Sequence, residues 1–161
     1  MAKKALYKPG DIFTLPLAEN VNGVGRILIV QSPSLFVGFY KRIIRNSESV
    51  NVDSLVHEEY LLKILCGDLG FSKKEWKIVG NHPLDGNISL PLFWGREPLS
   101  NELYLRKYNP PENQPLNMTG FKDRPTTENE ILKEGAQPDG LSGWKAAEIK
   151  LKYYLEKARI L

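Results

Sequence analysis

Short apolar segments separated by turn residues fill the first 40 positions, and this pattern constrains the fold more than any other feature. Residues 11–15 (DIFTL) alternate loosely in polarity and stop at Pro16, while residues 25–31 (GRILIVQ) and 35–40 (LFVGFY) are rich in β-branched and aromatic side chains. Between the first two segments lies Asn22-Gly23, a pair typical of a tight hairpin turn because both residues tolerate positive φ. The sequence therefore predicts an antiparallel meander with short connections.

The continuous apolar run at residues 27–30 indicates a strand that is covered on both faces, so other elements must pack on this sheet. The first element that we expect there is a helix over residues 54–65 that ends at Gly67. Its leucines can share one stripe, and they are Leu55, Leu61, Leu62 and Leu65. Residues 52–55 are also compatible with the beginning of a strand, and the sequence leaves both possibilities open.

Several later segments have strand character, and one long segment does not. Residues 74–80 alternate, and residues 103–108 form a good strand pattern. Residues 90–94 are interrupted by Pro91 and fit an edge strand or a loop that lines the core. Residues 109–125 are rich in proline and are expected to form a loop. The apolar side chains that can pin this loop to the body are Leu116, Met118 and Phe121.

The clearest single element is an amphipathic helix at the C-terminal end, which Ser142 is expected to cap. Its apolar face recurs at three- or four-residue steps and consists of Trp144, Ala147, Leu151, Tyr154 and Ala158. Burying one side chain such as Leu151 contributes about 1.5–3 kcal/mol, whereas a surface charge pair contributes about 1 kcal/mol or less. We therefore expect packing, rather than charge, to hold this helix.

Together these segments predict an α+β fold, with a strongly bent antiparallel sheet of about five or six strands packed by the C-terminal helix and one shorter helix. The chain has 161 residues, a length typical of one domain, so we expect residues 1–161 to form a single domain.

Charge and cysteine content restrict the function further. The formal net charge of +3 resides in the C-terminal helix, where bases outnumber acids, so the chain lacks the broad basic face of a typical nucleic-acid binder. The single cysteine, Cys66, rules out an intrachain disulfide and suits a reducing compartment. No apolar run has signal-peptide length, and none reaches the roughly 20 residues of a membrane helix. We expect a cytoplasmic protein without a membrane partner.

Candidate catalytic and metal-ligating residues are sparse. His57 precedes Glu58 and Glu59, but adjacent carboxylates point to different sides of a helix and do not converge on a metal. His82 lies in a turn sequence, and Cys66 is interpreted as a small buried core residue. We expect no enzyme activity, no metal and no cofactor, because the chain has no nucleotide-binding or nucleophile motif. Carboxylates that meet only in the folded chain leave a small hydrolase as an open alternative.

Basic and aromatic residues occur together in Phe39-Tyr40-Lys41-Arg42 and in Leu105-Arg106-Lys107-Tyr108. Nucleic-acid-binding sheets use such residues for base stacking and phosphate contacts. A nucleic-acid-binding module is therefore the alternative function, although aromatic residues in sheets more often serve cross-strand packing.

Three groups of residues follow one another along the chain. The first is 7–13 (YKPGDIF) with 15–17 (LPL) and 23–27 (GVGRI), the second is 76–81 (WKIVGN) with 83–84 (PL) and 90–93 (LPLF), and the third is 140–143 (GLSG). This ordered set resembles the Immunity protein 26 family of bacterial polymorphic toxin systems. The resemblance implies a single immunity-type domain that binds a cognate toxin domain and neutralises it, with no catalytic residues of its own. We interpret the motif residues, among them Gly10, Gly25 and Trp76, as scaffold.

If inhibition is the function, exposed residues of the types that dominate interfaces should contact the toxin. The candidates on the strands are Trp94, Arg96, Tyr104, Arg106 and Tyr108, and those on the following loop are Lys122, Asp123 and Arg124. An acidic stretch is predicted to meet the basic active cleft of a nuclease toxin, and it consists of Glu128, Glu130, Glu134 and Asp139.

Overall fold

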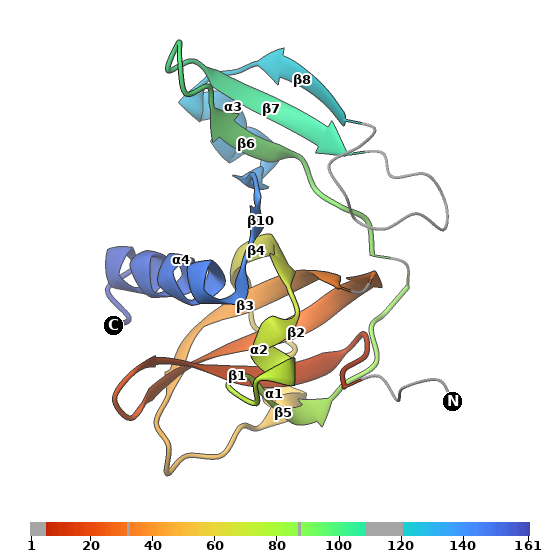
Figure 1. Ribbon diagram of the computed structural model, residues 1–161, viewed down its shortest axis with the longest axis vertical. Coiled ribbons are helices and arrows are strands. Elements are labelled where there is room, and N and C mark those ends of the chain that lie inside the picture. The colour runs from red at the N-terminus through yellow and green to blue at the C-terminus, as the bar shows by residue number, and fades with distance from the viewer. Residues whose placement is uncertain (1–5, 32, 87, 109–120) are drawn as a thin grey trace.

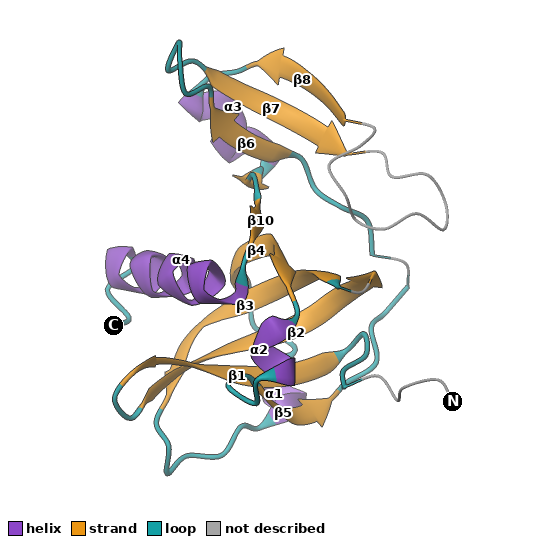
Figure 2. Cartoon of the chain, in the orientation of Figure 1, coloured by secondary structure: helices purple, strands orange, loops and turns teal. Residues whose placement is uncertain are grey.

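The computed structural model describes residues 6–31, 33–86, 88–108 and 121–161. Figure 1 shows two β-sheets, one above the other, with the C-terminal helix beside the lower sheet. That helix is much longer than the other helices, as the colouring in Figure 2 shows. In chain order the elements are β1 (Asp11–Ala18), β2 (Val21–Gln31), β3 (Ser34–Ile44), α1 (Val52–Leu55), β4 (Tyr60–Gly67), α2 (Leu69–Ser72), β5 (Lys77–Asn81), β6 (Phe93–Arg96), β7 (Leu103–Tyr108), β8 (Phe121–Pro125), α3 (Glu128–Glu134), β9 (Gln137–Pro138), β10 (Leu141–Ser142) and α4 (Trp144–Lys157).

The lower, first sheet contains six strands in the order β10-β4-β3-β2-β1-β5. Its β1–β2–β3 meander is antiparallel, as predicted. The first turn of the meander was misplaced, because it lies at Asn20, where φ is 56°, and not at Asn22-Gly23. Gly23 lies inside β2, where a Cβ atom would be 2.4 Å from Cδ2 of Leu151. The glycine therefore lets α4 approach the sheet closely.

β2 is covered on both faces, as its continuous apolar run predicts. Ile27 is fully buried in a cluster that includes Leu151 of α4, and Leu28 is buried on the other face in a cluster with Phe93 of the second sheet. Register shifts between β2 and β3 bend the strand, as β-bulges do.

α4 packs on the first sheet through three fully buried side chains, Ala147, Leu151 and Leu155. The first two belong to the predicted apolar face, and Leu155 adds to it. Trp144 and Tyr154 lie beside this buried stripe as partly buried residues. The prediction that an apolar stripe holds this helix against the sheet is confirmed.

Backbone pairing, rather than a side-chain cap, fixes the start of α4. The predicted cap Ser142 belongs to β10, where it lies opposite Cys66 of β4, and Gly143 occupies the N-cap position. One turn into the helix, Glu148 accepts a 3.0 Å hydrogen bond from the buried indole of Trp76. This bond ties α4 to the segment that precedes β5.

The helix predicted over residues 54–65 is wrong for most of its length. Only Val52–Leu55 is helical, and Tyr60–Gly67 forms strand β4 between β3 and β10. Ile64 is buried in the cluster that includes α4, whereas Leu65 is buried in the cluster that includes the second sheet. A strand with both faces covered is apolar throughout, and a short run of this kind cannot be distinguished from a helix by periodicity.

The upper, second sheet contains four short strands in the order β8-β7-β6-β9, and the sequence did not predict it as a separate layer. Residues 90–94, expected at an edge or in a loop, lead into β6 in the middle of this sheet. Phe121–Pro125, expected to be loop, is strand β8 paired with β7. Leu116 and Met118, which were predicted to pin that loop, lie outside the described residues, as does the side chain of Phe121.

An apolar cluster and one buried arginine position the second sheet on the first. The ring of Phe93 lies edge-on to Phe36 of β3 and to Tyr108 of β7, with ring centroids 6.3 and 5.3 Å away. The guanidinium of Arg26 donates hydrogen bonds of 2.6 and 3.0 Å to the carbonyl oxygens of residues 82 and 83, where the chain leaves the first sheet. These two bonds hold the backbone in place at the point where the chain leaves the first sheet for the second.

These elements confirm the α+β class, and three motif residues, Gly10, Gly25 and Trp76, have the structural positions expected of a scaffold. Gly10 has a φ of +89°, and a Cβ at Gly25 would lie 2.6 Å from the ring of Phe13. Trp76 is buried and stacks on the same ring with centroids 5.3 Å apart. Within the described residues, no helix is both long and apolar enough to cross a lipid bilayer.

Candidate functional site

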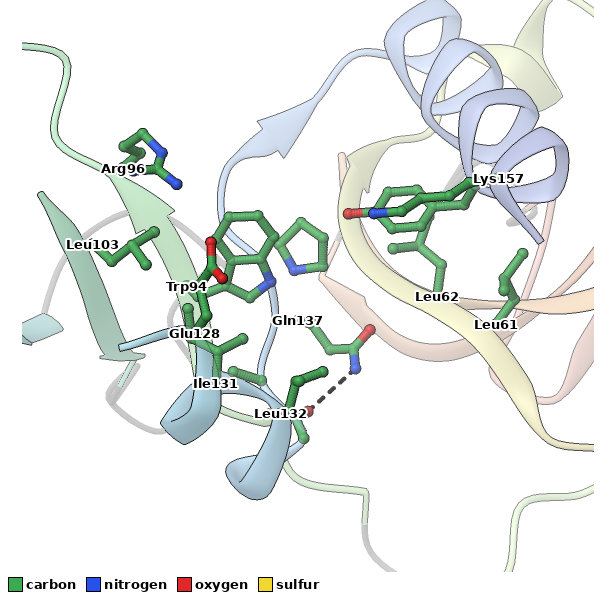
Figure 3. A pocket seen from close by; sticks show the side chains of 14 residues that line it. Leu61, Leu62, Trp94, Arg96, Leu103, Glu128, Ile131, Leu132, Gln137 and Lys157 are labelled. Carbon is green, nitrogen blue, oxygen red and sulfur yellow. Dashed lines mark hydrogen bonds between the residues drawn. The ribbon is translucent and has the colours of Figure 1, made fainter. Parts of the chain in front are cut away.

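An open groove with a volume of about 490 Å³ lies between the second sheet with α3 on one side and β4 with α4 on the other. Figure 3 shows these two walls facing each other. The residues that define the groove are Trp94, Arg96, Leu103, Glu128, Ile131 and Leu132 on the first wall, residues 135–138 between the walls, and Leu61, Leu62, Tyr154 and Lys157 on the second wall.

The lining of the groove is apolar inside and charged at its margin. Its large apolar residues, such as Trp94 and Tyr154, are half-buried, whereas the charged residues Arg96, Glu128 and Lys157 are exposed. An apolar surface surrounded by exposed charge is the usual composition of a protein-binding patch.

Local signals at both ends explain why the sequence forms α3 next to the groove. Oγ1 of Thr127 accepts a hydrogen bond from the backbone N–H of Glu130 at 3.3 Å, and Gly135 ends the helix with a φ of 63°. Ile131 and Leu132 thereby reach the groove, and Leu132 remains 80% exposed. Our sequence interpretation treated this segment only as an acidic stretch. The spacing of Thr127 and Glu130 is the capping-box signature that would have revealed the helix.

Gln137 of β9 joins the two sheets at the base of the groove. Its Oε1 accepts a hydrogen bond from the backbone N–H of Lys63 in β4 at 2.8 Å, and its Nε2 donates to the carbonyl oxygen of Gly135 at 3.2 Å. Because β9 belongs to the second sheet, the bond to Lys63 ties that sheet to β4 at the base of the groove.

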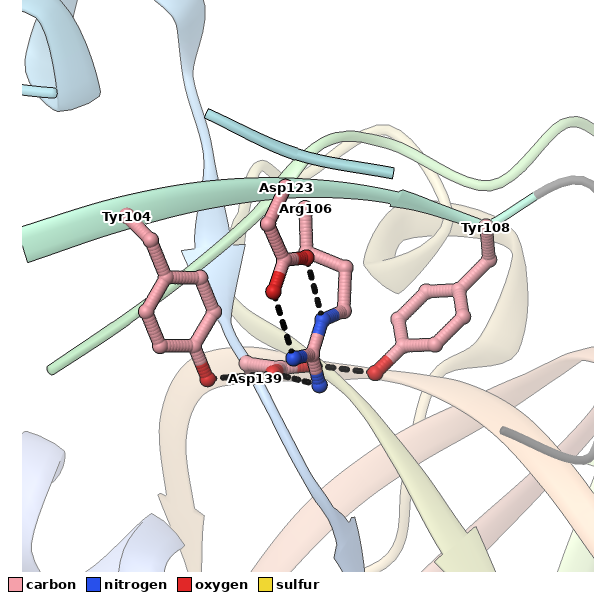
Figure 4. Close-up of polar contacts among 5 residues, drawn as sticks. All are labelled: Tyr104, Arg106, Tyr108, Asp123 and Asp139. Atoms are coloured by element: carbon pink, nitrogen blue, oxygen red, sulfur yellow. Dashed lines mark hydrogen bonds and ion pairs between the residues drawn. The ribbon is translucent and has the colours of Figure 1, made fainter. Parts of the chain in front are cut away.

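A polar cluster, here called the Asp139 cluster, lies on the face of β7 that bears alternate residues of the strand (Figure 4). The nearly buried carboxylate of Asp139 accepts hydrogen bonds from Tyr104 at 2.7 Å, from Arg106 at 2.9 Å and from Tyr108. Asp123 of β8 binds the same guanidinium through both of its oxygens, at 2.7 and 2.8 Å. The cluster therefore connects β7, β8 and the segment between β9 and β10.

The two phenols and the Arg106–Asp123 pair of this cluster have shifted pKa values. Burial, followed by the hydrogen bond to Asp139, raises the pKa of the Tyr104 phenol to about 12, and burial likewise raises the pKa of Tyr108. The hydrogen bond between Arg106 and Asp123 raises the pKa of the guanidinium and lowers the pKa of the carboxyl. Neither the phenols nor the Arg106–Asp123 pair is therefore suited to proton transfer near neutral pH.

The structure divides the predicted contact residues into separate sets. Trp94, Arg96 and Glu128 line the groove. The four candidates Tyr104, Arg106, Tyr108 and Asp123 form the cluster around Asp139, with their polar groups bonded inside the chain. The sequence interpretation missed residues that complete the groove, above all Leu132, Tyr154 and Lys157. No local pattern could have revealed the last two, because they face the groove only in the assembled fold.

The remaining candidates lie at the edge of the second sheet and on α3. Arg124 of β8 forms an ion pair with Glu130 of α3, and Thr126 donates a 2.9 Å hydrogen bond to the same carboxylate. Glu134 is exposed at the end of α3. The side chain of Lys122 lies outside the described residues. The predicted acidic surface is thereby reduced to Glu128 and Glu134, because Glu130 is paired and Asp139 is bonded within its cluster.

The aromatic residues that suggested nucleic-acid binding do not offer surfaces for base stacking. Phe39 and Tyr40 are fully buried, and Tyr108 of β7 is buried in the cluster between the two sheets. Arg42 forms an ion pair with Glu58. Only exposed lysines of the two segments remain for phosphate contacts, so the structure gives this alternative no specific support.

Residues considered for catalysis or metal binding have structural or solvated positions. Cys66 is fully buried, and burial raises the pKa of its thiol to about 12. A buried thiol with a raised pKa is unreactive, which agrees with the prediction of a core residue. His57 is exposed after α1, and His82 is half-buried before the second sheet. Among the residues that the structure describes, no group of three or more His, Cys, Asp or Glu side chains is placed to hold a metal ion.

No curated protein and no solved structure gives a significant match to the chain. The sequence model of one family, described as Immunity protein 26, matches residues 8–105, which is more than half of the 161 residues. This match contains nearly all of the first two motif groups, from β1 to β6, whereas residues 140–143 lie beyond it. It also contains the groove residues of β4, β6 and β7, while α3 and α4 follow it in the chain. The chain therefore belongs to the Immunity protein 26 family.

Proposed function

We propose that this protein is a bacterial immunity protein that binds a cognate toxin domain one-to-one and blocks its action in the cytoplasm. The family match over residues 8–105 carries this proposal. In this role the protein acts by binding and not by catalysis, and residues 1–161 work as a single immunity-type domain.

The contacts between the two sheets support a role in binding. Gln137 and the buried ring of Phe93 hold the second sheet against the first, and the Asp139 cluster bonds β7 and β8 to the segment that leads to β10. A surface that is fixed before binding loses little conformational entropy on association, which favours tight complexes. A protein that must neutralise a lethal domain benefits from such preorganisation.

The exposed residues around the groove supply the types of contact that dominate protein interfaces. Trp94 and Arg96 are of the residue types enriched among interface hot spots, and Leu132 extends the apolar lining outward. Glu128 is an exposed acid on the same wall, and Glu134 is an exposed acid of α3 outside the groove lining. Two acids are too few to single out a nuclease toxin, so the activity of the toxin is left out of the proposal.

Co-expression in bacteria tests the proposal. The toxin domain encoded by the neighbouring gene is expressed from an inducible plasmid, with or without this chain, and colony counts are compared. We expect survival only with the chain, and we expect the tagged chain to retain the toxin domain in a pull-down. Equal killing in both strains, with both proteins present in the lysate, would contradict the proposal.

A further inference from the structure

The groove contains an apolar surface that this chain leaves uncovered. Its volume of about 490 Å³ lies within the range of about 300–1,000 Å³ that is typical of ligand-binding clefts. Leu132 is 80% exposed beside this surface, although a leucine gains free energy when it is buried. A partner that covers Leu132 and the indole of Trp94 therefore gains apolar contact without any rearrangement of the chain.

The charges that α3 and α4 bring to the groove are opposite. Glu128 of α3 is an exposed acid and Lys157 of α4 is an exposed base, while Arg96 of β6 adds an exposed base next to Trp94 on the first wall. Lys150, two turns before Lys157, lies on the same side of α4 and is half-buried. Within the described residues, neither Glu128 nor Lys157 forms an ion pair. Both charges are therefore available to a partner.

This arrangement selects a partner of defined chemistry. Opposite charges on facing walls favour a polypeptide segment that presents a base towards α3 and an acid towards α4. The apolar lining between the walls favours a large aliphatic or aromatic side chain as the central anchor. We infer that the groove receives one large apolar side chain from a segment of the toxin domain, with a basic residue of that segment beside Glu128 and an acidic residue beside Lys157. This inference rests on the proposed function.

Two matched pairs of exposed residues allow a sharp test. Leu132→Gln removes an apolar contact in the groove, and Ile149→Gln removes a similarly exposed apolar side chain, 70% exposed, from the outer face of α4. Lys157→Glu reverses a charge in the groove, and Lys152→Glu reverses an exposed charge of the same helix that does not line it. All four side chains are exposed, so the variants are expected to fold, and circular dichroism with urea titration checks this.

Affinity for the purified toxin domain of the neighbouring gene is measured by calorimetry. We expect Leu132→Gln and Lys157→Glu each to weaken binding at least about tenfold, whereas Ile149→Gln and Lys152→Glu change it by less than about twofold. If the wild-type chain binds and both groove variants bind equally well, the inference is overturned and the proposed function stands. If the wild-type chain does not bind, both fall. If the wild-type chain dimerises in sedimentation experiments and Leu132→Gln makes it monomeric, the groove accepts a second copy, and the inference is again overturned.

Discussion

Removal of the Asp139 carboxylate is expected to loosen the second sheet while the first sheet stays intact. In the folded chain this carboxylate accepts hydrogen bonds from two phenols and one guanidinium, and its side chain is only 5% exposed. Loss of one partner from a buried charged pair costs about 3–5 kcal/mol. Arg106 keeps its two bonds to Asp123, so its charge stays neutralised, and most of the loss comes from the phenols of Tyr104 and Tyr108, whose hydrogen bonds to this carboxylate are lost. Each unsatisfied buried group costs about 1–3 kcal/mol.

We therefore expect Asp139→Ala to lower the free energy of unfolding by about 3–5 kcal/mol in urea titrations. Asp139→Asn keeps one oxygen acceptor and is expected to cost about half as much. The matched control is Glu134→Ala, an exposed acid of α3, for which we expect a change within about 0.5 kcal/mol. Hydrogen exchange should accelerate at the amides of β6 and β7 before those of β2 and β3. A loss below about 1 kcal/mol for Asp139→Ala, or uniform acceleration in both sheets, would refute the account of this cluster.

Three further predictions follow from single side chains. Leu151→Ala should lower the free energy of unfolding by about 2–5 kcal/mol, because Leu151 is fully buried between α4 and the first sheet. The control is Ile149→Ala, which truncates an exposed side chain of the same helix. Equal losses of unfolding free energy in the two variants would argue against this packing. The pKa of the Asp123 carboxyl is lowered in the folded state by its hydrogen bond to Arg106, so it stabilises the fold above its unfolded pKa of about 3.9, and this contribution is lost as the pH falls through the lower folded pKa. Wild type and Asp123→Asn should therefore differ in stability at pH 7 and converge below about pH 3, as urea titrations across pH can show; a difference that persists unchanged at low pH would contradict it. The Cys66 thiol should resist a disulfide reagent at pH 8 in the native protein and react at once in urea, because it is buried and its pKa is raised to about 12; fast labelling of the native protein would contradict its core position.

The elements that could be predicted from the sequence are those with long, regular patterns. The apolar stripe of α4 and the β1–β3 meander were identified because their periodicities persist over many residues. β4 was mistaken for a helix because both of its faces are covered, which removes the alternation that identifies a strand. The capping residues Thr127 and Gly135 carried enough information to locate α3, and only the acidic character of the segment was used.

The candidate site was only partly accessible to sequence reasoning, because the fold assembles it from distant segments. Trp94 and Arg96 were selected by residue type alone and do line the groove. The opposite wall comes from Leu61 of β4 and from Tyr154 and Lys157 of α4, and no local pattern indicates that these residues face the second sheet. Conversely, arginine is a residue type that is enriched at interfaces, but the guanidinium of Arg106 forms ion pairs with two carboxylates of its own chain. Residue type suggests which side chains are suited to an interface, whereas the fold determines which of them remain available.

Neutralisation by direct binding can be tested most directly by titrating the purified toxin domain with this protein and measuring the remaining toxin activity. We expect activity to fall linearly with added protein and to reach its minimum at an equimolar ratio, because a preorganised surface forms a tight one-to-one complex. Toxin activity that stays unchanged at a several-fold molar excess of folded protein would contradict the account.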